Sequence, residues 1–240
     1  MDIYLPAGRS STTTKLIIMI HGGGWSEGDK SDFNSYVDTI KRRLPDYAIV
    51  NINYRLANAS SSSNPFPTQE NDVKSAFDFV NNNRAKYLIS DKWVALGASA
   101  GAHLAMLQAY KQGTPKIKVV VNFFGPSDMV AMHNNPASGF APPSSIATLL
   151  QGTPTTNPTL YQSSSPINFV SATSAATITF HGSQDLLVRL SQQTALHAKL
   201  SASGVTQQLV TYPTEGHGWV GANLVNSFDR MQSFLAANVL

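Results

Sequence analysis

The chain has 240 residues, 42% of them hydrophobic, which is enough for one large domain with a sizeable core and excludes wholesale disorder. Only 13% of the residues are charged, the net charge is +3, and the longest basic run is Lys41–Arg43, so no nucleic-acid partner is expected. The absence of cysteine excludes disulfides and thiolate metal sites. The longest apolar run, Leu16–Ile20, is far shorter than the ~20 residues of a membrane span.

Short apolar, β-branched runs alternate along the chain with segments of helical period. The runs predict strands buried on both faces at Lys15–Ile20, Tyr47–Asn53, Lys92–Leu96, Ile117–Phe124, Ala176–Phe180 and Gln207–Tyr212. Apolar stripes predict helices over Phe33–Leu44, Val73–Val80 and Leu224–Leu235. This alternation predicts an α/β domain over residues 1–240, with a mostly parallel central sheet and helices on both faces.

Two irregular segments interrupt the alternation. Asn58–Pro67 is rich in Ser, Asn and Pro and predicts a loop. Gly125–Ser171 is a much longer Pro-, Ser- and Asn-rich stretch. Because so long an excursion inside a compact domain is usually functional, we expect residues 125–171 to form a partial lid.

A glycine-rich motif, His21-Gly22-Gly23-Gly24-Trp25, directly follows the first long predicted strand. Consecutive glycines let the backbone approach a substrate closely and turn successive N–H groups inward, as a developing oxyanion requires. A flexible glycine turn is the alternative interpretation. His21 is expected to support this loop by hydrogen bonding rather than to transfer a proton.

A second motif, Gly97-Ala98-Ser99-Ala100-Gly101, fits G-x-S-x-G between a predicted strand and a predicted helix. In this context the glycines permit a sharp strand-to-helix turn that holds the serine Oγ above the sheet. Ser99 is therefore the candidate nucleophile, and a structural Ser-Gly turn is the alternative. The presence of both motifs favours a catalytic interpretation of each.

A serine hydroxyl needs a base, and six histidines are available. His217 lies between two glycines in a loop after the last predicted strand, so it can reach the strand ends and is the candidate base. His103 follows Ser99 on a helix and is expected in the core, while His181 is expected to shape a turn. His133 and His197 are poorly placed for proton transfer.

The base needs an orienting carboxylate, and Asp185 follows the penultimate predicted strand at the same sheet edge as His217. Asp128, after the preceding strand, is the rival; its alternative role is a helix N-cap. Asp72 is expected to pair with Arg55 or to cap a helix. No ligand spacing supports a metal site built from Asp185, His217 and a neighbouring histidine, so no metal is expected.

The chain order Ser99, Asp185, His217 resembles that of the α/β-hydrolases, and the H-G-G-G loop resembles that of the hormone-sensitive-lipase-like esterases. Three departures from that pattern are visible. Trp25 replaces the more usual Phe, as in kynurenine formamidase-like members, and no acidic residue precedes Ser99. The N-terminal cap helices are absent because the first strand begins at residue 2, which indicates either a minimal version or removal of upstream residues such as a secretion signal.

The resemblance implies a serine carboxylesterase that needs no cofactor and whose partner is a small-molecule ester. It assigns the oxyanion N–H groups to Gly23, Gly24 and Ala100. Substrate contacts are expected from Trp25, Trp219 and Val220, and crowding by the two tryptophans favours short acyl groups, acetyl to roughly hexanoyl, because each buried methylene contributes only about 0.8 kcal/mol.

Three alternatives remain open at this point. The same catalytic residues also serve arylformamidases and peptidases, and Trp25 is the feature that favours the former. A non-catalytic α/β-hydrolase-like binding protein is the alternative of another class. Low charge with abundant Ser, Thr and Asn gives a weak indication of an extracytoplasmic protein.

Overall fold

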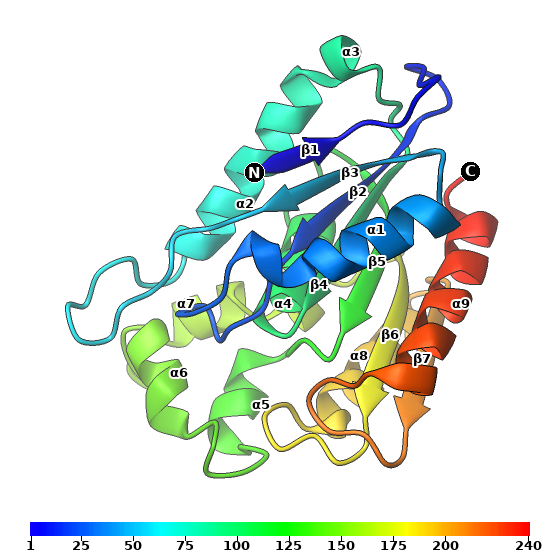
Figure 1. Cartoon of the computed structure of the whole chain (residues 1–240). Coiled ribbons are helices and arrows are strands. Elements are labelled where there is room, and N and C mark those ends of the chain that lie inside the picture. Colours follow the sequence, from blue (N-terminus) through cyan, green and yellow to red (C-terminus); the bar gives the residue numbers. More distant parts are fainter.

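The computed structural model describes all 240 residues and contains one seven-stranded sheet with the strand order β1-β3-β2-β4-β5-β6-β7 (Figure 1). The strands are β1 (Asp2–Tyr4), β2 (Lys15–Ile20), β3 (Tyr47–Ile52), β4 (Trp93–Ala98), β5 (Ile117–Phe123), β6 (Ala176–Gly182) and β7 (Gln207–Tyr212). Only β1 is antiparallel to its neighbour, and all other pairs are parallel. The mostly parallel sheet predicted from the sequence is confirmed.

Helices cover both faces of this sheet. They are α1 (Asn34–Arg43), α2 (Thr68–Asn82), α3 (Arg84–Tyr87), α4 (Ala100–Tyr110), α5 (Met129–Asn134), α6 (Pro143–Leu149), α7 (Pro158–Ser163), α8 (Leu190–Ala202) and α9 (Gly221–Asn238), with short 3₁₀ turns at Lys30–Phe33 and Pro166–Phe169. None of the helices is long and apolar enough to cross a membrane. Figure 1 shows α1 and α9 on one face of the sheet.

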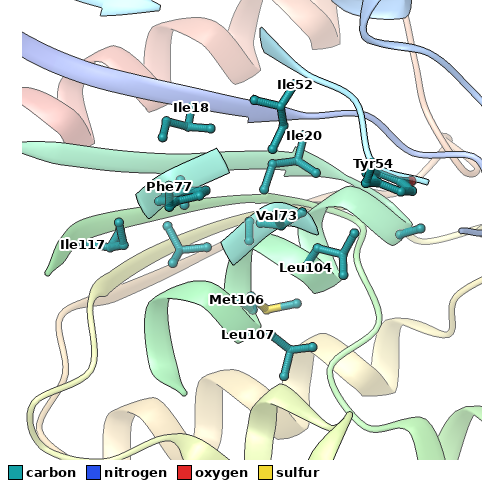
Figure 2. Packing of buried hydrophobic residues seen from close by; sticks show 14 of the residues in the cluster. Ile18, Ile20, Ile52, Tyr54, Val73, Phe77, Leu104, Met106, Leu107 and Ile117 are labelled. Carbon is teal, nitrogen blue, oxygen red and sulfur yellow. The ribbon is translucent and has the colours of Figure 1, made fainter. Parts of the chain in front are cut away.

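Alternate residues of the central strands belong to two separate cores. On β2, Leu16, Ile18 and Ile20 belong to the core that includes residues of α2, α4 and α8, whereas Ile17 and Met19 belong to the core that includes residues of α1 and α9. Figure 2 shows the first of these cores, in which Phe77 of α2 and Leu104 of α4 lie against strand residues. Burial on both faces explains why the strand sequences are continuously apolar.

The 125–171 segment is more regular than its composition predicts. It contains α5, α6 and α7, and buries Met129, Ile146, Leu149 and Tyr161 in the same core as α2 and α4. Each of its helices has only six or seven residues, too few to show a periodic apolar stripe. The segment is therefore packed on the carboxyl-end side of the sheet by its own apolar residues.

Candidate active site

Ser99 occupies the turn between β4 and α4 with φ 53° and ψ −122°, a strained conformation for a residue with a side chain. The neighbouring glycines make the turn possible. A Cβ on Gly97 would overlap the backbone of Gly101, and a Cβ on Gly101 would overlap the carbonyl oxygens of Ile20 and His21. The glycine spacing read in the sequence thus has a direct steric cause, and it presents the Ser99 side chain at the carboxyl end of the sheet.

Three side chains from three separate loops meet at this turn. His217 Nε2 lies 2.9 Å from Ser99 Oγ, and His217 Nδ1 lies 2.7 Å from Asp185 Oδ2. An ionised carboxylate can only accept, so Nδ1 carries the hydrogen and Nε2 is left to accept the serine proton. The three side chains thus form a hydrogen-bonded relay that runs from Asp185 through His217 to Ser99.

Asp185 is held as an anion by its surroundings, although its side chain is only 1% exposed. Oδ1 accepts hydrogen bonds from the backbone N–H groups of Leu187, at 2.7 Å, and Val188, at 2.9 Å. Burial alone raises the pKa of Asp185, but the hydrogen bond from His217 and the two backbone donors outweigh it, so the pKa lies below its usual range.

The glycine-rich loop after β2 lies against the serine turn. A Cβ on Gly22 would stand 3.0 Å from the Ala98 carbonyl oxygen and 3.4 Å from Ser99 Cβ. Gly23 has φ 98° and Gly24 has φ 55°, values that a glycine adopts without steric cost. The backbone N–H groups of Gly23, Gly24 and Ala100 donate no hydrogen bond within the protein, so they are free for a ligand.

His21 and Tyr54 support this loop from below. The His21 ring stacks on Tyr54 with the ring centroids 4.3 Å apart, and Nδ1–H donates to the Gly22 carbonyl oxygen at 2.8 Å. The Tyr54 hydroxyl lies 3.1 Å from the His21 carbonyl oxygen and 3.0 Å from that of Gly22. His21 thus holds the glycine loop and does not reach the serine, as the sequence predicts.

A cleft of about 650 Å³ opens above Ser99 and His217. Trp25 lines it from the glycine loop, and its indole Nε1–H donates to His103 Nδ1 at 3.2 Å. The 125–171 segment contributes a second wall through residues that include Met132, Phe140 and Ile146. Aromatic and aliphatic side chains therefore line the cleft around the polar groups of Ser99 and His217.

Two expected pocket residues lie elsewhere. Trp219 is buried against Tyr212 and Phe124 with its Nε1–H donated to Ser227, and it does not line the cleft. Val220 is 79% exposed at the start of α9. The expectation was wrong for both residues because Gly218, at φ 111°, turns the chain away immediately after His217.

Phe124 is a cleft residue that the sequence analysis missed. It follows β5, has φ 46°, and places its ring centroid 4.5 Å from that of His217. A bulky aromatic residue at the end of a strand, directly before Gly125-Pro126, was the available signal.

The remaining candidates take structural positions. Asp128 caps α5 by accepting from the Ala131 N–H at 2.9 Å, and Asp72 forms an ion pair with Arg55 at 2.7 Å. His103 is fully buried and lies with Nε2 2.7 Å from the Ser164 carbonyl oxygen. His181 donates from Nε2 to the Val188 carbonyl oxygen at 2.9 Å, which shapes the turn that carries Asp185.

Comparison with known proteins assigns the family. The family model BD-FAE matches residues 1–200. The chain belongs to the BD-FAE family. Among curated proteins it is similar to esterase LipQ of Mycobacterium tuberculosis, with 25% identity over 225 residues covering 88% of this chain and 52% of LipQ. The chain thus spans about half the length of this curated relative.

Two solved structures resemble this member of the BD-FAE family over 98% of its length. One, described as a bifunctional GH43-CE from Bacteroides eggerthii, has a TM-score of 0.82 and 27% identity, with 35% of that chain covered. The other, described as a truncated carbohydrate esterase from gut microbiota, has a TM-score of 0.77 and 25% identity, with 89% of that chain covered. The fold is that of the α/β-hydrolases, as the resemblance implied.

Proposed function

We propose that this protein is a serine carboxylesterase that removes short acyl groups through an acyl-enzyme intermediate. The observation that carries the proposal is the relay of Ser99, His217 and Asp185, with separations of 2.9 and 2.7 Å. The free N–H groups of the glycine loop beside Ser99 support it, as do the esterase names of the relatives. The proposed roles are nucleophile for Ser99, general base for His217 and orienting anion for Asp185.

The reaction takes two acyl-transfer steps. Ser99 Oγ attacks the ester carbonyl carbon while its proton passes to His217 Nε2, and the carbonyl oxygen becomes an oxyanion that accepts from Gly23, Gly24 and Ala100. Collapse breaks the carbon–oxygen bond, and His217 returns the proton to the departing alcohol. Water, deprotonated by the same histidine, then attacks the acyl-serine, releasing the acid and regenerating Ser99.

The proposed acyl preference is acetyl to roughly hexanoyl. Trp25 and Phe124 are large rings in the lining of the cleft that also contains Ser99, and their bulk limits the room for a long chain. A methylene contributes only about 0.8 kcal/mol when buried, so a chain that extends into water gains little. We also propose that the 125–171 segment covers part of the bound substrate.

The alcohol side of the proposed substrate is a neutral polyhydroxylated group such as a carbohydrate. A polar groove of about 630 Å³ lies between residues 57–65 and α6, and shares Gly24, Ser26, Ser145 and Leu149 with the cleft. Its lining has hydroxyl and amide side chains and no charged residue. Neutral hydrogen-bonding groups suit sugar hydroxyls, and the carbohydrate-esterase description of a solved structure supports the same class.

The test compares kcat/KM for p-nitrophenyl acetate, butyrate and palmitate, and measures acetate release from an acetylated xylo-oligosaccharide. We expect acetate and butyrate esters to be hydrolysed faster than palmitate, acetate to be released from the sugar, and a fluorophosphonate probe to label Ser99. A protein that neither turns over esters nor takes up the probe would be a binding protein instead. Faster turnover of N-formylkynurenine than of any ester would favour the arylformamidase alternative.

A further inference from the structure

A small apolar pocket lies behind the proposed active site, between α1, α9 and the sheet. Its volume is about 120 Å³, and eleven of its twelve lining residues are hydrophobic, among them Met19, Tyr36, Leu224 and Phe228. This volume is close to the about 150 Å³ of an engineered apolar cavity that binds benzene. The pocket is thus large enough for the end of an aliphatic chain and offers almost no hydrogen-bonding group to a polar one.

The pocket and the cleft share one wall. Phe124 and Ala98 line both cavities, and Ala98 is the residue directly before Ser99. On the pocket side, the Phe124 ring meets Trp219 edge-on at a centroid distance of 5.5 Å; on the cleft side it lies 4.5 Å from the His217 ring. Since the Ala98 side chain is a single methyl group, the Phe124 ring is the bulk of the partition.

The backbone fixes the position of this ring. Phe124 has φ 46°, a conformation that a bulky residue adopts only when its surroundings impose it. Its N–H donates to the Phe180 carbonyl oxygen at 2.9 Å, and the next N–H, of Gly125, donates to Asn122 Oδ1 at 2.8 Å. A Cβ on Gly125 would lie only 2.9 Å from the His103 backbone nitrogen, so this turn cannot shift inward.

We propose that Phe124 determines acyl-chain length by separating the cleft from this apolar pocket. The proposal rests on the proposed esterase activity. With Phe124 in place, an acyl group on Ser99 ends against the ring; with the ring removed, the cleft and the pocket become one apolar channel. Each methylene that enters this channel raises kcat/KM about fourfold relative to one left in water.

The experiment measures the ratio of kcat/KM for p-nitrophenyl octanoate to that for p-nitrophenyl acetate, in Phe124→Ala and in the wild type. We expect the variant to raise this ratio tenfold or more. A ratio controls for any general loss of activity caused by moving the neighbouring His217. Because a large truncation can impair folding, Phe124→Val is measured in parallel, with a smaller rise in the ratio as the expected result.

Two further variants isolate the pocket from the cleft. Leu224→Trp fills the pocket from α9, so adding it to Phe124→Ala should return the ratio to the wild-type value, while Leu224→Trp alone leaves the ratio unchanged. Phe140→Ala is the matched control, because Phe140 lines the cleft but not the pocket. An equal rise in Phe140→Ala, or a rise that Leu224→Trp does not reverse, overturns the role of the pocket.

The outcomes separate this inference from the proposed function. If wild-type protein hydrolyses p-nitrophenyl acetate but both folded Phe124 variants keep the wild-type ratio, the partition is wrong and the esterase proposal stands. If the wild type neither hydrolyses the acetate nor takes up a fluorophosphonate, the esterase proposal itself fails.

Discussion

Two recesses adjoin the candidate active site, and they differ in chemistry, in size and in whether they are continuous with the cleft. The groove between residues 57–65 and α6 measures about 630 Å³, is lined by neutral polar groups and is continuous with the cleft. The pocket between α1 and α9 measures about 120 Å³, is almost wholly apolar and lies behind Phe124. On the proposed function, the groove suits a polar alcohol of some size, whereas Phe124 keeps the acyl chain out of the apolar pocket.

On the proposed function, the groove contacts the alcohol of the ester and the wall of the pocket limits the acyl group. The groove is built from loops and a short helix that lie above the sheet, so its polar side chains remain in contact with water. The pocket lies at the edge of the core between α1 and α9, next to the buried Phe123 and Phe228 and the partly exposed Tyr36 and Leu224, and its lining offers polar groups almost no partner. The proposed selectivities for the alcohol and for the acyl group therefore rest on separate parts of the chain.

The largest effect is expected from removing the proposed nucleophile, which every substrate needs whichever recess it contacts. Ser99→Ala should lower kcat by about 10⁴-fold or more, because His217 and Asp185 cannot act without the nucleophile. The loss should be equal for octanoyl and acetyl esters and for sugar and p-nitrophenyl esters. Steady-state kinetics check this, with circular dichroism to show that the variant is folded. Ordinary turnover by folded Ser99→Ala would contradict the assignment of the nucleophile.

Asp185→Asn should reduce turnover by a similar factor of about 10⁴, because an amide lets His217 take the wrong tautomer. Asp128→Asn is the matched control, since Asp128 caps α5 and does not touch His217. We expect the control to keep turnover within a few fold of wild type on every ester. The same kinetic assay compares the two variants. An inactive Asp128→Asn together with an active Asp185→Asn would assign the orienting carboxylate to Asp128, after β5, instead of Asp185, after β6.

Acid should act on the groove side of the cleft through His103. Burial lowers the pKa of His103 to about 4. This ring holds Trp25 by a hydrogen bond and lies near Phe66, which directly follows the groove residue Pro65. The unfolded chain takes up this proton near pH 6.5, whereas the folded protein resists it down to about pH 4. The free energy of unfolding therefore keeps its full value above pH 6.5 and falls as the pH drops toward 4. His103 accounts for roughly 3 kcal/mol of this fall.

Urea unfolding at a series of pH values measures this loss. His103→Asn should be less stable than wild type at pH 7 because it loses packing and hydrogen bonds, but its free energy of unfolding should change less between pH 6.5 and 4. Wild-type and variant curves that run parallel across this range would show that His103 carries no part of the acid sensitivity.

Parts of this comparison were accessible from the sequence, and parts were not. The strands were predictable because burial on both faces requires continuous apolar runs, as in β2 and β3. Ser99 and His217 could be recognised because each lies in a tight turn, and such a turn requires glycine at nearby positions in the sequence. Motifs of this kind are local, so a sequence displays them directly.

The residues that line the two recesses come from parts of the chain that are far apart in the sequence. Trp219 lies two positions from His217 in the chain yet is turned into the core by Gly218, while Phe124, far away in sequence, contacts His217. The helices of the 125–171 segment are too short for a periodic stripe, although Pro143 and Pro158 each mark a first helical position. Neighbours in space that come from different elements depend on packing, which sequence adjacency does not encode.

The smallest expected effect tests the groove alone. Ser144 lies on the exposed side of α6 and lines the groove but not the cleft. Ser144→Trp should therefore fill the groove without contacting Ser99 or His217. Each hydrogen bond to a sugar contributes about 1 kcal/mol, so the loss of one or two should lower kcat/KM on an acetylated xylo-oligosaccharide about tenfold. Turnover of p-nitrophenyl acetate should stay within about twofold, since its alcohol makes no use of such hydrogen bonds.

Ser201→Trp, on the exposed face of α8, is the matched control and should leave kcat/KM unchanged on both substrates. Acetate release and p-nitrophenol absorbance measure the two reactions; an equal loss on both substrates would mean that the groove positions the catalytic cleft rather than the sugar.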